Sequence, residues 1–109
     1  MHELGITQEV VALAHEAAAG RRVTRVVLEI GKLSGVLPDA VRFCFDLCAE
    51  GTAVAGAVLE IVEPAGRGRC RACGGAVELE RAFGQCGCGG TDLEWLAGDE
   101  LRVRELEVA

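Results

Sequence analysis

The sequence predicts an α+β protein in which two helices and a small sheet of about three strands carry an inserted, zinc-ribbon-like module. Three observations support this prediction. Two stretches repeat apolar residues at the period of a helix, others alternate at the period of a strand, and four closely spaced cysteines separate the last two main strands. At 109 residues, the chain has the length of one small domain with such an insert.

The first helix is expected over residues 4–19, where alanine is frequent and apolar residues recur at helical spacing. The apolar residues that we expect to be buried are Leu4, Val10, Val11, Leu13, Ala14 and Ala18. Gly20 follows as a C-terminal stop. His15 is expected near the polar side of the helix, and we assign it no functional role.

A strand is expected over residues 23–30, because Val26, Leu28 and Ile30 alternate with residues of the opposite face. A second helix is expected over residues 38–50 and has a proline at its first position, where proline is favoured. The apolar residues of this helix are spread widely around it. We therefore expect it to pack on more than one side.

Cys44 and Cys48 lie four residues apart in the second helix and hence on the same side of it. This spacing can place two side chains on one metal ion. No histidine lies close to them in the sequence, and free cysteine is among the residues that proteins bury most often. We therefore interpret both as buried apolar residues.

Two further strands, at residues 57–62 and 100–108, flank the cysteine segment. We expect them to be neighbours in one sheet, with the cysteine segment inserted between them. The expected division is an α+β domain of residues 1–63 and 99–109 and a zinc-binding insert of residues 64–98. A short strand at residues 76–79 is expected within the insert.

Four cysteines form the expected metal site: Cys70 and Cys73 in a C-x-x-C turn, then Cys86 and Cys88 around Gly87. Zinc takes four thiolates in a tetrahedron at about 2.3 Å, and two close pairs can supply them. The second pair is one residue shorter than is usual, and we expect Gly87 to permit this spacing. Cys88 is the best fourth ligand, with Asp92 or water as the alternative.

Other uses of these cysteines are less consistent with the sequence. Disulfides require an oxidising compartment, and no apolar signal segment follows the first methionine. A redox-active C-x-x-C begins a helix in thioredoxin-like proteins, whereas Cys73 is followed by two glycines. Iron instead of zinc remains open, because four cysteines alone do not distinguish the two metals.

Charge and composition restrict the classes of function. The net charge of −6 disfavours nucleic-acid binding, which needs a basic surface. No apolar run approaches the roughly 20 residues of a membrane span. We expect a protein with reduced thiols in the cytoplasm. No arrangement of serine, histidine and acid, or of paired carboxylates, indicates an enzyme.

The amino terminus, Met1-His2-Glu3, can form a second metal site. Removal of an initiator methionine usually requires a small second residue, so we expect Met1 to remain. Its α-amine, the ionised amide and imidazole of His2, and the amide of Glu3 can then bind one metal ion. A nitrogen-rich, planar set of this kind suits Ni(II) or Cu(II) better than zinc.

The chain resembles, over essentially its whole length, the HypA/HybF family of hydrogenase nickel-incorporation accessory proteins. The segments that carry the resemblance are MHELGITQEVV, VVLEIGKLSGVLPDAVRFCFDLCAEGT, LEIVE, the paired-cysteine module and LRVRELEV. One feature departs from the family pattern, whose second cysteine pair usually reads C-x-x-C, whereas this chain has Cys86-Gly87-Cys88.

The resemblance implies a nickel metallochaperone that helps to load the large subunit of [NiFe]-hydrogenase and works with a GTPase accessory protein. It implies that His2 anchors Ni(2+), with Glu3 close by. It also implies that the four late cysteines hold structural Zn(2+). The alternative is a zinc-ribbon adaptor that binds another protein and has an inert amino terminus. Whether the client is a hydrogenase or a urease cannot be read from these residues.

Overall fold

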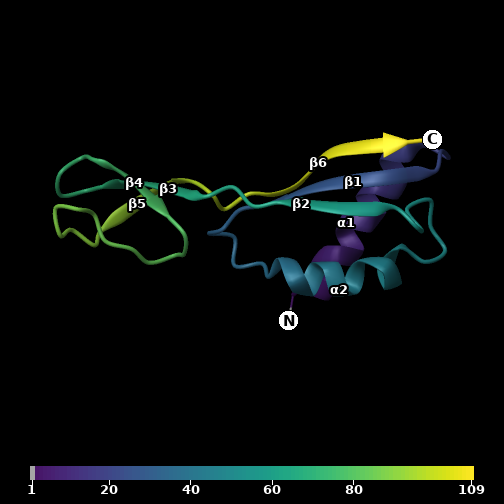
Figure 1. The fold of residues 1–109 in the computed structure, drawn as a ribbon, viewed down its shortest axis with the longest axis horizontal. Helices are drawn as coiled ribbons and strands as arrows, with labels where there is room; N and C mark the ends of the chain where they lie inside the picture. The colour runs from purple at the N-terminus through teal and green to yellow at the C-terminus, as the bar shows by residue number, and fades with distance from the viewer. Residues whose placement is uncertain (1) are drawn as a thin grey trace. The chain divides into compact units, whose positions relative to one another are not determined.

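The computed structural model of the protein describes residues 2–109, which form two helices and two small sheets (Figure 1). In chain order the elements are α1 (Glu3–Ala18), β1 (Val23–Ile30), α2 (Pro38–Ala49), β2 (Val58–Val62), β3 (Gly66–Cys70), β4 (Ala76–Leu79), β5 (Leu93–Ala97) and β6 (Leu101–Val108). The α+β class is therefore confirmed. The chain divides into two compact units. The first contains the residues before Ile30 together with Val36–Val62 and Arg102–Ala109, and the second contains Ile30–Gly35 and Glu63–Leu101.

The sheet of the first unit has the strand order β2-β1-β6. β1 and β2 are parallel, with Arg25 opposite Val58 and Glu29 opposite Val62, and α2 provides the long connection that parallel strands require. β6 lies on the other side of β1. The expectation that the second and last strands of this sheet are neighbours is therefore wrong, because β1 occupies the position between them.

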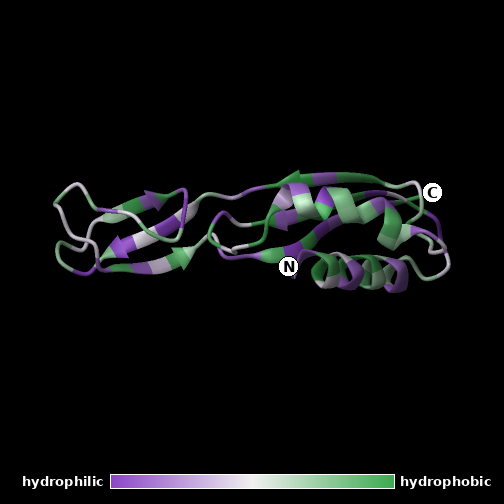
Figure 2. Cartoon of the chain, turned by 90° about the horizontal axis from the view of Figure 1, so that it is seen from below, coloured by the Kyte–Doolittle hydropathy of each residue, from purple (hydrophilic) through white to green (hydrophobic). Residues whose placement is uncertain are grey.

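One hydrophobic core holds this unit together. Its buried members come from α1, β1, α2 and the loop that follows α2, and Val103, Leu106 and Val108 of β6 pack against it. The buried members are Val11, Ala14, Ala18, Val23, Val26, Phe45, Ala49, Val54 and Ala57. Figure 2 shows hydrophobic residues along both helices and the strands beside them. Within the described chain, neither helix combines the length and hydrophobicity needed to cross a membrane.

Several apolar helix residues are more exposed than the sequence predicted. Leu4 and Leu13 of α1 are 46% and 58% exposed. In α2, Phe43 and Leu47 are 86% and 70% exposed, while Val41, Phe45 and Ala49 are buried. The expectation that α2 packs on more than one side is therefore wrong for residues 2–109. Its buried residues all lie on one side, because they belong to the one core that the helix shares with α1 and the sheet.

The face of β1 opposite the core carries ion pairs. The guanidinium of Arg25 contacts the carboxylates of Glu60 on β2 and of Glu105 and Glu107 on β6. Arg102 Nε donates to Glu29 Oε2 at 2.7 Å. These contacts connect all three strands of the sheet on the face opposite the core.

The sheet of the second unit has the order β4-β3-β5, with β3 antiparallel to both neighbours. The sequence did not predict β3, because Gly66-Arg-Gly-Arg lacks apolar alternation. Gly66 and Gly68 are nevertheless buried. A Cβ atom at residue 66 would lie 2.5 Å from Leu33 Cγ, and one at residue 68 would lie 3.1 Å from the carbonyl oxygen of Glu94. Close packing therefore excludes a side chain at residues 66 and 68.

The loop Ile30–Gly35 belongs to the second unit, although it precedes α2 in the sequence. Its backbone N–H groups at Gly31, Lys32 and Leu33 donate to the carbonyl oxygens of Glu100, Pro64 and Gly98 at 2.7–3.0 Å. The side chain of Leu33 is buried. This loop is thus a structural part of the unit that contains the cysteines.

Candidate metal centre

The four late cysteines converge in the second unit. Cys70 ends β3 and Cys73 follows in the next turn, whereas Cys86 and Cys88 lie in the loop between β4 and β5. The four Sγ atoms all lie within 4.8 Å of one another. Among the described residues, this is the one group of three or more histidine, cysteine or acidic side chains with such a geometry. The predicted convergence of these residues is therefore found.

The sulfur separations match a tetrahedral metal site. Sγ of Cys70 lies 3.7 Å from Sγ of Cys88, and Sγ of Cys73 lies 3.6 Å from Sγ of Cys86. A tetrahedron with metal–sulfur bonds of about 2.3 Å has edges of about 3.8 Å. A disulfide would need about 2.05 Å. The donor set and its dimensions therefore fit a zinc ion held by Cys70, Cys73, Cys86 and Cys88.

The two cysteine turns have the same hydrogen-bond pattern despite their different lengths. In the first, the N–H of Gly74 donates to the carbonyl of Cys70 at 2.8 Å, and the N–H of Gly75 donates to Sγ of Cys73 at 3.4 Å. In the second, the N–H of Gly89 donates to the carbonyl of Cys86 at 2.8 Å, and the N–H of Gly90 donates to Sγ of Cys88 at 3.4 Å. The short C-x-C turn thus provides the same donors as the C-x-x-C turn.

The glycines that this geometry requires differ from the one that the sequence singled out. Gly74 and Gly89 have positive φ angles of 75° and 94°, which favour glycine. A Cβ atom at residue 90 would lie 2.8 Å from Sγ of Cys70, whereas one at residue 87 would meet no atom within 4 Å. Gly87 is also absent from the residues with positive φ. The expectation that Gly87 permits the short spacing is therefore wrong.

The sequence contains a signal for the glycines that shape these turns, which the prediction from Gly87 did not take into account. Each cysteine pair is followed directly by two glycines, Gly74-Gly75 and Gly89-Gly90. The first glycine of each pair adopts the left-handed conformation, and the second donates its N–H to the preceding thiol. Repetition of the glycine pair indicates that the two turns are equivalent.

Hydrogen bonds from the backbone also favour the thiolate form of Cys70. The backbone N–H of Cys73 donates to Sγ of Cys70, and the backbone of Ala72 makes a further hydrogen bond to the same sulfur. Together these bonds lower the pKa of the Cys70 thiol to about 7. Cys70 is also the most buried of the four cysteines. A thiolate at neutral pH is the form that binds a metal ion.

Asp92, the alternative fourth ligand, has a different partner. Its Oδ1 accepts a hydrogen bond from Nε of Arg71 at 3.2 Å, and its carbonyl accepts the N–H of Arg71 at 3.0 Å. These contacts join the first cysteine turn to the chain just before β5. Asp92 therefore holds the turn in place, and the sulfur cluster is complete without it.

Cys44 and Cys48 are outside the cluster and are half-buried. Cys48 packs against the core of the first unit. Burial, with a smaller effect of Cys44, raises the pKa of the Cys48 thiol. The interpretation of this pair as apolar residues is consistent with that position, although neither thiol is fully buried.

The predicted nickel site begins at the start of α1. Met1 lies outside the described residues. His2 is exposed and precedes the first helical residue. Glu3, by contrast, is 8% exposed, and its Oε2 accepts the N–H of Leu37 at 3.3 Å. His2 is therefore accessible to solvent, whereas Glu3 is buried.

His15, which received no role, has a structural one. Its Nδ1 accepts the backbone N–H of Ala53 at 3.0 Å and thereby fixes the loop after α2 against α1. Both histidines are exposed, and His15 is distinguished by this hydrogen bond through its Nδ1.

The fold and the cysteine cluster define a small α+β protein with a four-cysteine metal-binding module. A family model described as "Hydrogenase/urease nickel incorporation, metallochaperone, hypA" matches residues 1–108. The chain belongs to this HypA family of metallochaperones.

Relatives and solved structures agree with this assignment. Proteins named hydrogenase maturation factor HypA from Nostoc punctiforme and from Geobacter sp. strain M21 are 55% and 50% identical over 108 and 109 residues. These matches cover 99% of this chain and 96% and 99% of the two relatives. The solution structure of the Ni metallochaperone HypA from Helicobacter pylori is similar with a TM-score of 0.69 at 26% identity, covering 99% of this chain and 97% of that one.

Proposed function

We propose that this protein carries Ni(2+) and delivers it to the large subunit of a [NiFe]-hydrogenase during maturation. The observation that carries the proposal is the family match over residues 1–108, which includes the Met1-His2-Glu3 terminus. A GTPase accessory protein is the expected partner in delivery, together with the hydrogenase subunit. A cysteine site that needs reduced thiols is consistent with action in the cytoplasm.

In this proposal His2 is the principal nickel ligand. Its exposed position allows the ion to be received from, and passed to, another protein. The amine of Met1 and the amides of His2 and Glu3 complete a planar set of nitrogen ligands. Ionising these amides costs no intrahelical hydrogen bond, because the first four N–H groups of a helix have no partner within it.

The cysteine cluster has a different role, which is to hold structural Zn(2+). Zinc in a closed four-thiolate site contributes folding free energy and exposes no open position for chemistry. It would cross-link the end of β3 and the loop before β5, since these segments carry the four ligands. Nickel exchange at the terminus and zinc retention in the cluster are then separate properties of one chain.

The nickel site is expected to respond to acid. Nickel binding requires a neutral amine, a neutral imidazole and ionised amides, so protons compete with the ion. The nickel affinity should therefore fall as pH decreases from 7.5 toward 6. Such a decrease provides a way to release the ion.

The test is a nickel titration of untagged protein, with metal content measured in parallel, at pH 7.5 and pH 6. We compare wild type with His2→Ala and, as a matched control, with His15→Gln, since these are the two histidines of the chain. The expected result is one nickel site that is lost in His2→Ala, kept in His15→Gln and weaker at pH 6, with zinc unchanged in all three proteins. Equal nickel binding by His2→Ala and wild type would contradict the proposal and favour a zinc-ribbon adaptor.

A further inference from the structure

The four cysteines of the metal centre differ in their access to solvent. Cys70 is 1% exposed, Cys86 is half-buried, and Cys73 and Cys88 are exposed. Gly87, next to Cys86, is exposed as well, and a Cβ atom at this position would meet no atom within 4 Å. A small reagent can therefore reach three of the four residues, and Cys70 is the one that it cannot reach.

The second cysteine of each pair accepts a hydrogen bond from the backbone. Sγ of Cys73 accepts the N–H of Gly75, and Sγ of Cys88 accepts the N–H of Gly90, both at 3.4 Å. Such a bond engages a lone pair of the thiolate and stabilises its negative charge. The sulfur then attacks an electrophile more slowly. The two exposed cysteines are therefore also the ones that these glycines moderate.

The first cysteines of the two pairs differ, because the two turns differ in length. In the C-x-x-C turn, the backbone of Ala72 and Cys73 makes hydrogen bonds to Sγ of Cys70. The C-x-C turn is one residue shorter, and the N–H of Gly89 already closes it onto the carbonyl of Cys86. Within residues 2–109, no N–H donates to Sγ of Cys86. Its sulfur thus combines access to solvent with the lack of a backbone donor.

Cys73 lies where a second thiol could react with an oxidised Cys86. The two Sγ atoms are 3.6 Å apart, and Cys73 is exposed. Sγ of Cys70 instead lies 3.7 Å from Sγ of Cys88. Closing the first gap to the roughly 2.05 Å of a disulfide requires only a small movement of the exposed turns.

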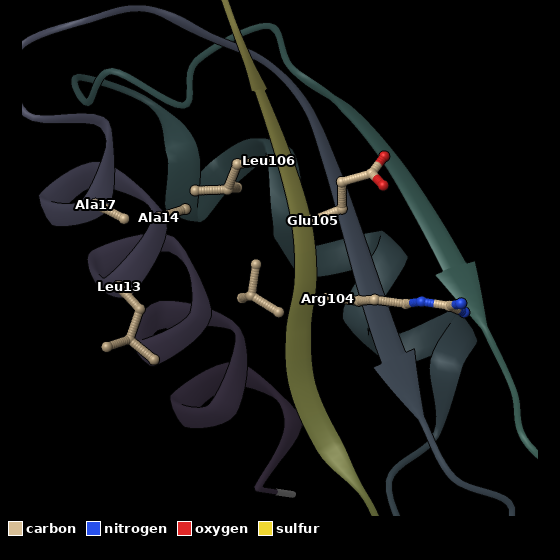
Figure 3. A pocket seen from close by; sticks show the side chains of 7 residues that line it. Leu13, Ala14, Ala17, Arg104, Glu105 and Leu106 are labelled. Atoms are coloured by element: carbon tan, nitrogen blue, oxygen red, sulfur yellow. The ribbon is translucent and has the colours of Figure 1, made fainter.

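The first unit offers no comparable site among its described residues. Cys44 and Cys48 are half-buried, and burial raises the pKa of the Cys48 thiol, which keeps it protonated at neutral pH. Figure 3 shows the apolar groove between α1 and β6, with Leu13 on the helix and Leu106 on the strand. None of the residues that line this groove is a cysteine. The reactive sulfurs of the described chain therefore belong to the metal centre.

We propose that Cys86 is a peroxide-sensitive site, and that its oxidation opens the zinc cluster through a disulfide with Cys73. The inference rests on the structural role of zinc in the proposed function. It adds a modification site that depends on the short C-x-C turn of this chain. The electrophile is a hydroperoxide, ROOH, which includes hydrogen peroxide.

The chemistry has two steps. The thiolate of Cys86 attacks the terminal oxygen of the hydroperoxide, the O–O bond breaks, and the sulfur becomes a sulfenic acid. The leaving alkoxide, or hydroxide, takes one proton from solvent. The thiolate of Cys73 then attacks this sulfur, an S–S bond forms, and hydroxide leaves and takes a second proton to become water. The two cysteines lose two electrons, and the peroxide gains them.

Oxidation changes how the second unit is held together. Two thiolates, those of Cys70 and Cys88, remain for the ion, and a structural zinc site needs four ligands. The covalent link between the first cysteine turn and the loop before β5 is kept by the disulfide. A thiol reductant reverses the reaction, because a disulfide exchanges with an attacking thiolate. The site is therefore expected to lose zinc in peroxide and to regain it after reduction.

Alkylation of the zinc-loaded, untagged protein tests which sulfur reacts first. Iodoacetamide, a neutral electrophile, is added at one equivalent at pH 7.5, and the products are mapped by mass spectrometry. Trypsin places Cys73 in the peptide 72–81 and both Cys86 and Cys88 in the peptide 82–102, where fragmentation distinguishes them. We expect Cys86 to carry more than about half of the label on the cluster, because the most nucleophilic accessible thiolate reacts first.

Zinc release by hydrogen peroxide, followed with a chromogenic chelator, tests the consequence. We expect one zinc to be released per chain and a disulfide to join the peptides 72–81 and 82–102 through Cys73 and Cys86. Insertion of one glycine after Gly87 restores the C-x-x-C length and its additional N–H. This variant is expected to release zinc at least about fivefold more slowly, since susceptibility follows thiolate character. Gly87→Ala, which keeps the short turn, is the matched control and should behave like wild type.

The outcomes separate this inference from the proposed function. A protein that binds no zinc before treatment would contradict the structural role of the cluster, and this inference with it. With zinc bound, preferential alkylation of Cys73 or Cys88 would overturn the inference alone. Retention of zinc in peroxide, a disulfide between Cys70 and Cys88, or equally fast release from the insertion variant and Gly87→Ala would do the same. The mapping of wild type decides the question even if the insertion impairs zinc binding.

Discussion

Substitution of Gly90 by alanine is expected to weaken the metal site through a steric effect alone. The added Cβ would lie 2.8 Å from Sγ of Cys70 and 3.4 Å from Sγ of Cys88. Non-bonded heavy atoms prefer about 3.5–4.0 Å, so the first contact is about 1 Å too short. Alanine keeps the N–H that Gly90 donates to Cys88, and Gly90 does not have a positive φ. The substitution therefore changes the space around the sulfurs and keeps the hydrogen bond.

The magnitude follows from the positions of the two sulfurs. The sulfurs of Cys70 and Cys88 are 3.7 Å apart and belong to different turns. A methyl group that approaches both can be accommodated only if one turn moves away from the other. Disturbing the groups that orient metal ligands typically lowers metal affinity by about 10–100-fold. We expect the zinc affinity of Gly90→Ala to fall within this range.

Gly87→Ala is the matched control, because it adds the same methyl group to the same turn. A Cβ at residue 87 meets no atom within 4 Å, so its zinc affinity should stay within about twofold of wild type. The assay is competition for zinc with a chromogenic chelator at pH 7.5, with circular dichroism to check the fold. Equal losses in Gly87→Ala and Gly90→Ala would refute the reasoning, as would an unchanged affinity in Gly90→Ala.

Three further predictions concern the core, the second unit and pH. Phe45→Ala should lower the free energy of unfolding by about 3–5 kcal/mol in urea titrations, because Phe45 is 2% exposed. The control Phe43→Ala should change it by less than about 0.5 kcal/mol, because Phe43 is 86% exposed. Similar effects of the two substitutions would contradict the assignment of the core. Gly66→Ala should destabilise the protein by about 1–3 kcal/mol, since its Cβ would lie 2.5 Å from Leu33 Cγ, and a further Leu33→Ala should recover part of this loss in the same titration. Zinc affinity should decrease steadily as pH falls from about 8 to about 5.5, because the ion binds thiolates and protons compete for the cysteine sulfurs. The pKa of the Cys88 thiol is raised to about 11 in the metal-free chain, so this sulfur must lose a proton to bind zinc at every pH in that range. Chelator competition measures the affinity, and an affinity that is constant or rises with acid would contradict the prediction.

The sequence was sufficient for the elements that have clear periodicity. The structure places α1, β1, α2, β2, β4 and β6 within two residues of the expected ranges, because apolar residues at period two or 3.6 must face one core. The four cysteines were recognisable for a similar reason, since their spacing leaves few other uses. Features that depend on local spacing along the chain were therefore predictable.

Features that depend on contacts between distant residues were not predictable in this way. β3 lacked apolar alternation because its glycines make room for Leu33 and the backbone of Glu94. The position of β1 between β2 and β6 is a matter of topology, which no local pattern records. Likewise, Gly87 was expected to permit the short spacing because it lies between Cys86 and Cys88. The position where a side chain would collide with the sulfurs is Gly90, and it can be identified only once both cysteine turns are placed in space.

The loop Ile30–Gly35 has a consequence for attempts to separate or transplant the metal-binding unit. The chain passes from one unit to the other four times, after Glu29, Gly35, Val62 and Leu101. A fragment that begins after Val62 would lack Leu33, whose side chain packs on Gly66 and whose N–H donates to Gly98. Conversely, excising that fragment would leave Leu33 without its packing partner. The unit therefore cannot be transferred as one continuous segment, and a graft must supply both Ile30–Gly35 and Glu63–Leu101.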